Sequence, residues 1–107
     1  MTQFFNNLED DQMLIEKNKY SIGDIINLKL VSGDEIVGEL REHDNAGYSL
    51  KKPCVVITSA DGIGLVQAMF GLDPEKENLF YKDNHVITIC RTHEPMRDHY
   101  IKVTTAE

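Results

Sequence analysis

Hydrophobic and polar residues alternate with a period of two over residues 26–30 (INLKL) and again over residues 36–40 (IVGEL). Such alternation is typical of β-strands that bury one face. The run Ser32-Gly33-Asp34 between them has turn chemistry, so the two strands are predicted to form a hairpin. Its inward face carries isoleucine and leucine side chains together with Gly38.

Three more strands are predicted further along the chain. Asp44-Asn45-Ala46-Gly47 forms the next turn, and the strand after it is interrupted at Pro53, which suggests a bulge or an edge. Residues 65–70 (LVQAMF) and 85–91 (HVITICR) carry apolar side chains at consecutive positions. Both are therefore predicted to be buried on two faces, and some other element must cover the second face.

Helices are predicted at both ends of the chain. A short amphipathic helix follows Thr2, which can cap it, and a second helix begins at Pro95 with one apolar stripe at spacing i, i+4, i+7. Residues 72–79 are polar, contain a proline and are predicted to be a loop. The N-terminal apolar positions are Phe4, Phe5 and Leu8, and the C-terminal stripe consists of Met96, Tyr100 and Val103.

The organisation that follows is mainly β, with short antiparallel strands in a strongly curled sheet or small barrel. We expect an N-terminal helix or arm at residues 1–19, a β domain at residues 20–91, and a C-terminal helix and tail at residues 92–107. A chain of 107 residues fits one such domain.

Composition and charge bear on nucleic-acid binding, membrane contact and the state of the cysteines. The formal charge of −7 opposes sequence-independent binding to a phosphate backbone, so any nucleic-acid contact must be local, and Lys51-Lys52 is the one adjacent basic pair. No apolar run approaches the ~18 residues of a membrane span, and the first residues lack the features of a signal peptide, so we expect a cytoplasmic protein without membrane contact. Cys54 and Cys90 are predicted to be buried free thiols rather than a disulfide.

Candidate catalytic groups are few. His93 and His99 are six positions apart, without the i, i+4 spacing of a helical metal pair, and they are interpreted as solvated. No nucleophile, phosphate-loop or metalloprotease motif occurs in the sequence. We therefore expect no enzymatic activity, no cofactor and no metal.

Residues 22–50 (IGDIINLKLVSGDEIVGELREHDNAGYSL) resemble the first motif of the Sm, LSm and Hfq superfamily. The matching positions are a glycine, apolar residues at +3, +5 and +7, two further glycines and an aspartate. They are Gly23, Ile26, Leu28, Leu30, Gly33, Gly38 and Asp44, and the three glycines are taken as structural. Residues 81–87 (YKDNHVI) echo both the Sm and the Hfq second motif. With its C-terminal helix, the chain is most similar to the small Sm-like proteins that tailed bacteriophages, such as cyanophages, encode.

The resemblance implies a five-stranded, strongly bent antiparallel sheet, a small open barrel, that assembles into a homo-oligomeric ring of about five to seven subunits. A physical argument also favours a ring, because an uncovered apolar strand at a sheet edge is protected when it pairs with the edge of a neighbouring subunit. In the alternative, the terminal helices cover these strands within one subunit.

In this family, the loop after the second strand holds an aspartate, a stacking ring and an amide that read single-stranded RNA, and Asp44 matches the aspartate. The stacking position falls on Ala46, so Tyr48 or His43 would have to supply the ring and Asn45 the amide. The alternatives are that Tyr48 packs at a strand start and that Asn45 is a turn residue.

In the family arrangement, the cations of the second motif would add contacts to the phosphates of the RNA. Alternatively, these cations are polar groups exposed to solvent. These cations are Lys82, His85 and Arg91. The resemblance thus implies a factor that binds or modulates RNA, in the host cytoplasm if a phage encodes it. The alternative is a non-enzymatic ring for protein interaction or assembly that has lost the RNA pocket.

Overall fold

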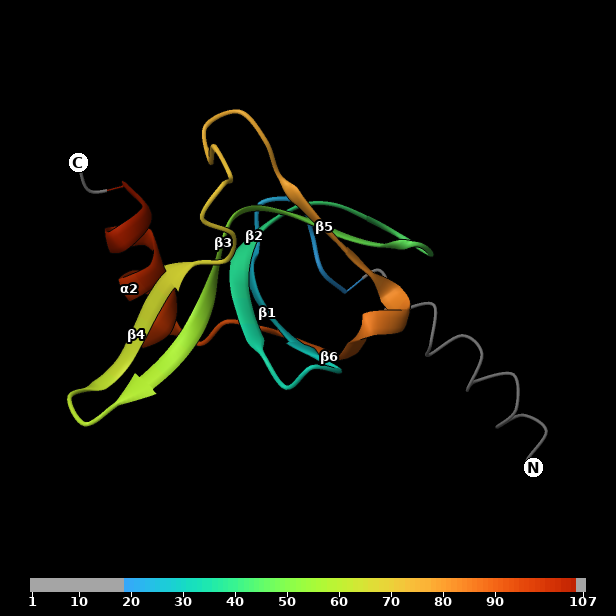
Figure 1. Ribbon diagram of the computed structural model, residues 1–107. Helices are drawn as coiled ribbons and strands as arrows, with labels where there is room; N and C mark the ends of the chain where they lie inside the picture. The colour runs from blue at the N-terminus through green and yellow to red at the C-terminus, as the bar shows by residue number, and fades with distance from the viewer. Residues whose placement is uncertain (1–18, 106–107) are drawn as a thin grey trace, which may run out of the picture.

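The computed structural model describes residues 19–105, and a bent antiparallel sheet with one helix beside it accounts for most of them (Figure 1). The strands are β1 (Ile25–Leu30), β2 (Glu35–Asp44), β3 (Gly47–Ser59), β4 (Gly62–Gln67), β5 (Leu79–Lys82) and β6 (Val86–Arg91). A 3₁₀ turn, η1 (Asp83–His85), precedes β6, and the helix α2 (Glu94–Thr105) follows it. The predicted N-terminal helix lies outside the described residues.

The sheet is open, with the strand order β4-β3-β2-β1-β6 and β5 paired separately with β3. Both β4 and β5 run antiparallel to β3, β4 along residues 54–59 and β5 along residues 47–50. They therefore act as two halves of one interrupted strand, and the connection between them loops away from the sheet (Figure 1). Five strands were predicted, and the structure has six. The additional strand is β5, which begins at Leu79, the last residue of the predicted loop.

Gly38 lies opposite a β-bulge. Val37 pairs with Cys54 and Glu39 pairs with Lys51, so two residues of β3 face Gly38 alone. One of them, Lys52, adopts a left-handed backbone with φ 50° immediately before Pro53. The bulge predicted from Pro53 is confirmed, and it produces a local bend of β3.

The two faces of the sheet bury different sets of side chains. The larger set, called here the main core, consists of Ile26, Leu28, Ile36, Leu40, Tyr48 and Leu50. The alternation predicted for the first two strands is confirmed by these positions. On the other face, Val37 and Cys54 pack with Tyr100 of α2, next to Val56 and Leu65. The helix therefore covers part of the second face, beside β3 and β4 (Figure 1).

Two predictions of burial are wrong, and both concern edges of the sheet. In the run 65–70, β4 ends at Gln67, and Val66, Met69 and Phe70 are exposed. In β6, Ile87 and Cys90 are exposed, because this strand has a paired neighbour on one side only.

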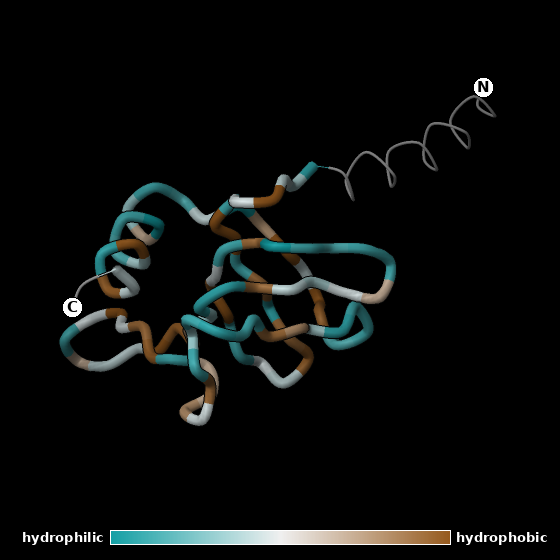
Figure 2. The backbone as a smooth tube through the Cα atoms, turned by 90° about the horizontal axis from the view of Figure 1, so that it is seen from above, coloured by the Kyte–Doolittle hydropathy of each residue, from teal (hydrophilic) through white to brown (hydrophobic). Residues whose placement is uncertain are grey.

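The predicted apolar stripe of the C-terminal helix is buried unevenly: Tyr100 is buried, Met96 is half-buried, and Val103 is 41% exposed although it lines a hollow with Cys54 and Leu65. Figure 2 shows that α2 is mostly hydrophilic, with short hydrophobic segments. None of the helices in the part of the chain described here has the length and apolarity needed to cross a bilayer.

Candidate nucleic-acid interface and the groove beside the C-terminal helix

The turn after β2 is closed by the carboxylate of Asp44. Its Oδ1 accepts hydrogen bonds from the backbone N–H of Ala46 at 2.8 Å and of Gly47 at 3.2 Å. Aspartate favours such turns because its short side chain reaches the backbone two residues on. Asn45 and Ala46 are left exposed at the tip, so the Asn45 amide is accessible to a ligand and the Asp44 carboxylate is occupied by the turn.

The two candidate stacking rings form a cross-strand pair below the turn. His43 and Tyr48 are direct partners of β2 and β3, with ring centroids 6.3 Å apart and an interplanar angle of 24°. Tyr48 belongs to the main core and is only 7% exposed, while Nε2 of half-buried His43 lies 3.1 Å from the carbonyl oxygen of Tyr20. The ring of Tyr48 therefore packs at the start of its strand and offers little surface to a base.

The cations of the second predicted motif lie at separate places. Lys82 pairs with Gly47 in the register of β5 and β3, and the N–H of Asp83 donates to the Ala46 carbonyl at 2.8 Å. Exposed Lys82 is thereby held beside the turn that carries Asn45. His85 is also exposed, and its carbonyl accepts a hydrogen bond from Val31 in the β1–β2 turn.

Arg91 lies at the opposite end of β6 from His85. Its guanidinium forms an ion pair with Asp24 at 3.2 Å, donates to the Lys19 carbonyl at 2.8 Å and lies 5.4 Å from the ring centroid of Tyr20. Arg91 is thus part of a different surface from the Asp44 turn. That surface is a groove that the sequence motifs did not identify.

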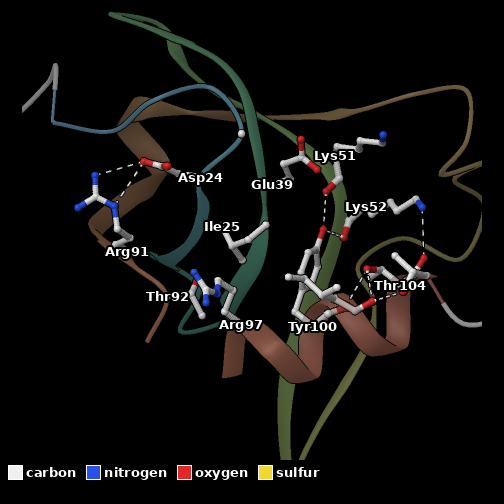
Figure 3. Close-up of a pocket in the computed structure, with 13 residues that line it drawn as sticks. Asp24, Ile25, Glu39, Lys51, Lys52, Arg91, Thr92, Arg97, Tyr100 and Thr104 are labelled. Atoms are coloured by element: carbon white, nitrogen blue, oxygen red, sulfur yellow. Dashed lines mark hydrogen bonds and ion pairs between the residues drawn. The ribbon is translucent and has the colours of Figure 1, made fainter. Parts of the chain in front are cut away.

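The groove, called here the α2 groove, is a cavity of about 530 Å³ between α2 and the sheet (Figure 3). Its charged lining residues are Asp24, Glu39, Lys51, Lys52, Arg91 and Arg97. Tyr100 shapes one wall, and its hydroxyl is within hydrogen-bonding distance of the carbonyls of Lys51 and Lys52, at 2.8 and 2.9 Å. The adjacent pair Lys51-Lys52 was the one sequence signal for this site, and the tertiary fold places it and Arg97 in the lining of the same groove.

Burial raises the pKa of one thiol and two phenols in or beside the sheet. It raises the pKa of the Cys54 thiol and raises the pKa of Tyr81 to about 12. Burial also raises the pKa of Tyr100 strongly, with smaller contributions from the negative charges of Cys54 and Glu39. These phenols stay neutral at physiological pH and act as structural groups.

Neither histidine of the C-terminal segment is placed as a metal ligand. His93 and His99 are exposed, and across residues 19–105 no cluster of three or more histidine, cysteine, aspartate or glutamate side chains is placed to hold a metal ion. Together with Ile63, they line a small hollow outside the first turns of α2.

No model of a known protein family matches this sequence, and no curated protein matches it. Two solved archaeal structures are similar to the folded chain. The SmAP1 heptamer of P. aerophilum is 20% identical, with a TM-score of 0.49, over 69% of this chain and 85% of that chain. A heptameric archaeal Sm protein is also 20% identical, with a TM-score of 0.49, over 68% of this chain and 91% of that chain. The mainly β fold class of this chain rests on its own strand order, bulge and helix.

Proposed function

We propose that this chain is an Sm-like, ring-forming cytoplasmic protein of the phage type that binds single-stranded RNA at the turn after β2. The register of glycines, apolar residues and Asp44 over residues 22–50 supports the family. The observation that carries the RNA site is the pairing of Lys82 with Gly47, because it holds a cation beside the exposed amide of Asn45. The Asn45 amide can exchange hydrogen bonds with a base, and Lys82 can contact a phosphate. Together they form a minimal site for an unpaired nucleotide.

Assembly is supported by the two edges of the sheet. β4 and β6 are the terminal strands of the sheet path, and both carry exposed apolar side chains: Ile63 and Val66 on β4 and Ile87 on β6. An open edge with apolar groups is protected when it pairs with another edge. Joining β4 of one copy to β6 of the next is a head-to-tail contact, which closes into a ring when the rotation allows. We propose about five to seven subunits.

A ring could also bind RNA in spite of its net negative charge. Each copy carries −7, so a ring as a whole repels a polyanion, and one amide with one lysine contributes too little to overcome this repulsion. Several turns on one face of the ring would bind one strand together, and linked sites gain affinity without new kinds of contact.

The test is a titration of the full chain with short uridine-rich and adenine-rich RNAs at two salt concentrations. We expect saturable binding at micromolar protein that weakens as salt rises. Asn45→Ala and Lys82→Gln should each weaken it, whereas Lys29→Gln, which removes an exposed cation near the end of β1, serves as the control. Tyr48→Ala also removes core packing, so it is interpreted only alongside a measurement of stability. Absence of saturable, salt-sensitive binding would refute the RNA site.

The second candidate is a protein-interaction ring without an RNA pocket, and a specific loop favours it. Phe70 is 88% exposed next to exposed Met69, on a turn that Gln67 holds by donating to the carbonyls of Met69 and Leu72 at 2.7 and 3.0 Å. A large aromatic side chain presented on a fixed turn is typical of interface anchors. Ring formation without RNA binding in the same titration would favour this candidate.

A further inference from the structure

The α2 groove collects more positive than negative charge, in contrast to the chain as a whole. Four cations and two carboxylates line it, whereas the whole chain carries −7. The cations come from separate segments: Lys51 and Lys52 from β3 at its bulge and just before it, Arg91 from the end of β6, and Arg97 from α2. This concentration is produced by the fold and not by a run of basic residues.

Both carboxylates of the groove already have cationic partners. Asp24 pairs with Arg91 at 3.2 Å, and Glu39 pairs with Arg41, outside the groove lining, at 2.9 Å. Lys52 lies 3.3 Å from Glu75, which is itself largely exposed.

The remaining two cations are Lys51 and Arg97. Among the described residues, the guanidinium of Arg97 has an ion pair only with the neighbouring Asp98, at 3.9 Å, and Lys51 has no ion pair. Figure 3 shows the Arg97 side chain rising from α2 toward Thr92 and Ile25, on the side of the groove where Arg91 also lies.

We propose that the α2 groove binds the phosphate groups of a nucleotide, with Arg97 and Lys51 as the principal contacts. A cavity of about 530 Å³ falls within the range of about 300–1,000 Å³ typical of small-molecule sites, and so has room for one nucleotide. Guanidinium groups bind phosphate through paired, charge-assisted hydrogen bonds, and lysine adds a point charge. The nucleotide is either free or the 5′ end of an RNA, and the site is independent of the turn at Asp44.

The experiment is isothermal titration of the full chain with ADP, with inorganic pyrophosphate, and with two short RNAs that differ only in a 5′-phosphate or a 5′-hydroxyl. We expect saturable binding of ADP or of the 5′-phosphorylated RNA, weakened by Arg97→Gln and by Lys51→Gln by about tenfold each, since each loses a charge-assisted contact. Arg97→Lys keeps the charge but loses the paired hydrogen bonds of the guanidinium, so it should weaken binding less than Arg97→Gln does.

The matched control is Lys102→Gln, which removes one cation from the same helix at an exposed position outside the groove lining. It should change the affinity by less than about twofold. ADP binding without any benefit of a 5′-phosphate on RNA identifies a free nucleotide as the source. Binding of the phosphorylated RNA alone identifies an RNA end.

Two outcomes overturn the proposal: no saturable heat with ADP or pyrophosphate up to about 1 mM together with equal binding of the two RNAs, or equal weakening by Lys102→Gln and Arg97→Gln. The RNA site at the turn after β2 has a separate readout. Asn45→Ala and Lys82→Gln should leave ADP binding unchanged, so failure of either proposal is distinguishable from failure of the other.

Discussion

Gly38 leaves room for the side chain of Leu50 in the main core. A Cβ atom at position 38 would lie 3.1 Å from both Cβ and Cδ1 of Leu50, which is fully buried. We expect Gly38→Ala to lower the free energy of unfolding by about 1–3 kcal/mol and Gly38→Val to prevent normal folding, because overpacking forces the core to shift. Gly71→Ala is the control, since nothing lies within 4 Å of its Cβ position. Chemical denaturation measures both, and a normally stable Gly38→Val protein would contradict the expectation.

Tyr81 should make the folded state sensitive to alkali. Burial raises its pKa from 10.0 to about 12, so between these values the unfolded phenol loses its proton while the folded one keeps it. The unfolded state then binds fewer protons, and the free energy of unfolding falls as pH rises above about 10, with no effect below that value. Urea midpoints from about pH 9 to about pH 11.5 should decline less steeply in Tyr81→Phe than in the original chain. Parallel declines in the two proteins would rule out this role.

At the scale of elements, α2 docks on the bulge of β3 rather than on a regular strand. The Tyr100 hydroxyl contacts the carbonyls of Lys51 and Lys52, and Nζ of Lys52 donates to the Thr104 carbonyl at 3.2 Å. At the other end of the helix, Thr92 donates to the side-chain oxygen of Asn27, and both side chains are buried. The helix is therefore fixed by polar contacts at both ends around one buried aromatic ring.

Removal of the Tyr100 hydroxyl should loosen α2 without unfolding the sheet. Tyr100→Phe leaves the carbonyls of Lys51 and Lys52 without this donor, at a cost of about 1–3 kcal/mol. Hydrogen exchange of residues 94–105 should accelerate, while amides of β1 and β2 stay protected. Val103→Ala, at an exposed position of the same helix, is the control. Unchanged exchange in Tyr100→Phe would show that the apolar contacts of the ring are sufficient.

Strand prediction succeeded where the two faces of a strand differ and failed where both carry apolar groups. In β1, Ile26 and Leu28 face the main core, as the period of two predicts. In β4 and β6 the pattern has no polar side, so sequence cannot distinguish burial within one subunit from an apolar edge. β5 was missed because its four residues are separated from β4 by the connection of residues 68–78, although both pair with β3.

At the scale of the whole molecule, the candidate sites depend on contacts between distant segments. The turn at Asp44 could be predicted because its chemistry is local, whereas the pairing of Lys82 with Gly47 depends on the β3–β5 register. The buried position of Tyr48 could not be separated from a stacking role by sequence, since both use an aromatic ring at a strand start. The α2 groove was not predicted at all, because its cations come from separate segments that line one cavity only in the folded chain.

The two open edges give the sharpest prediction for assembly. We propose that β4 of one copy pairs with β6 of the next. Val66→Lys or Ile87→Lys then places a charge in this contact, and each should convert the ring to monomers because charged edge residues oppose strand pairing. Both side chains are exposed within the subunit, at 38% and 63%, so thermal stability of the monomer fold should change little. Val31→Lys is the matched control, because Val31 is 61% exposed but lies in the β1–β2 turn, outside both edge strands. Light scattering over a range of concentrations measures the mass. A monomer in the original chain at every concentration refutes the ring, and rings that persist in both edge variants place the contact elsewhere.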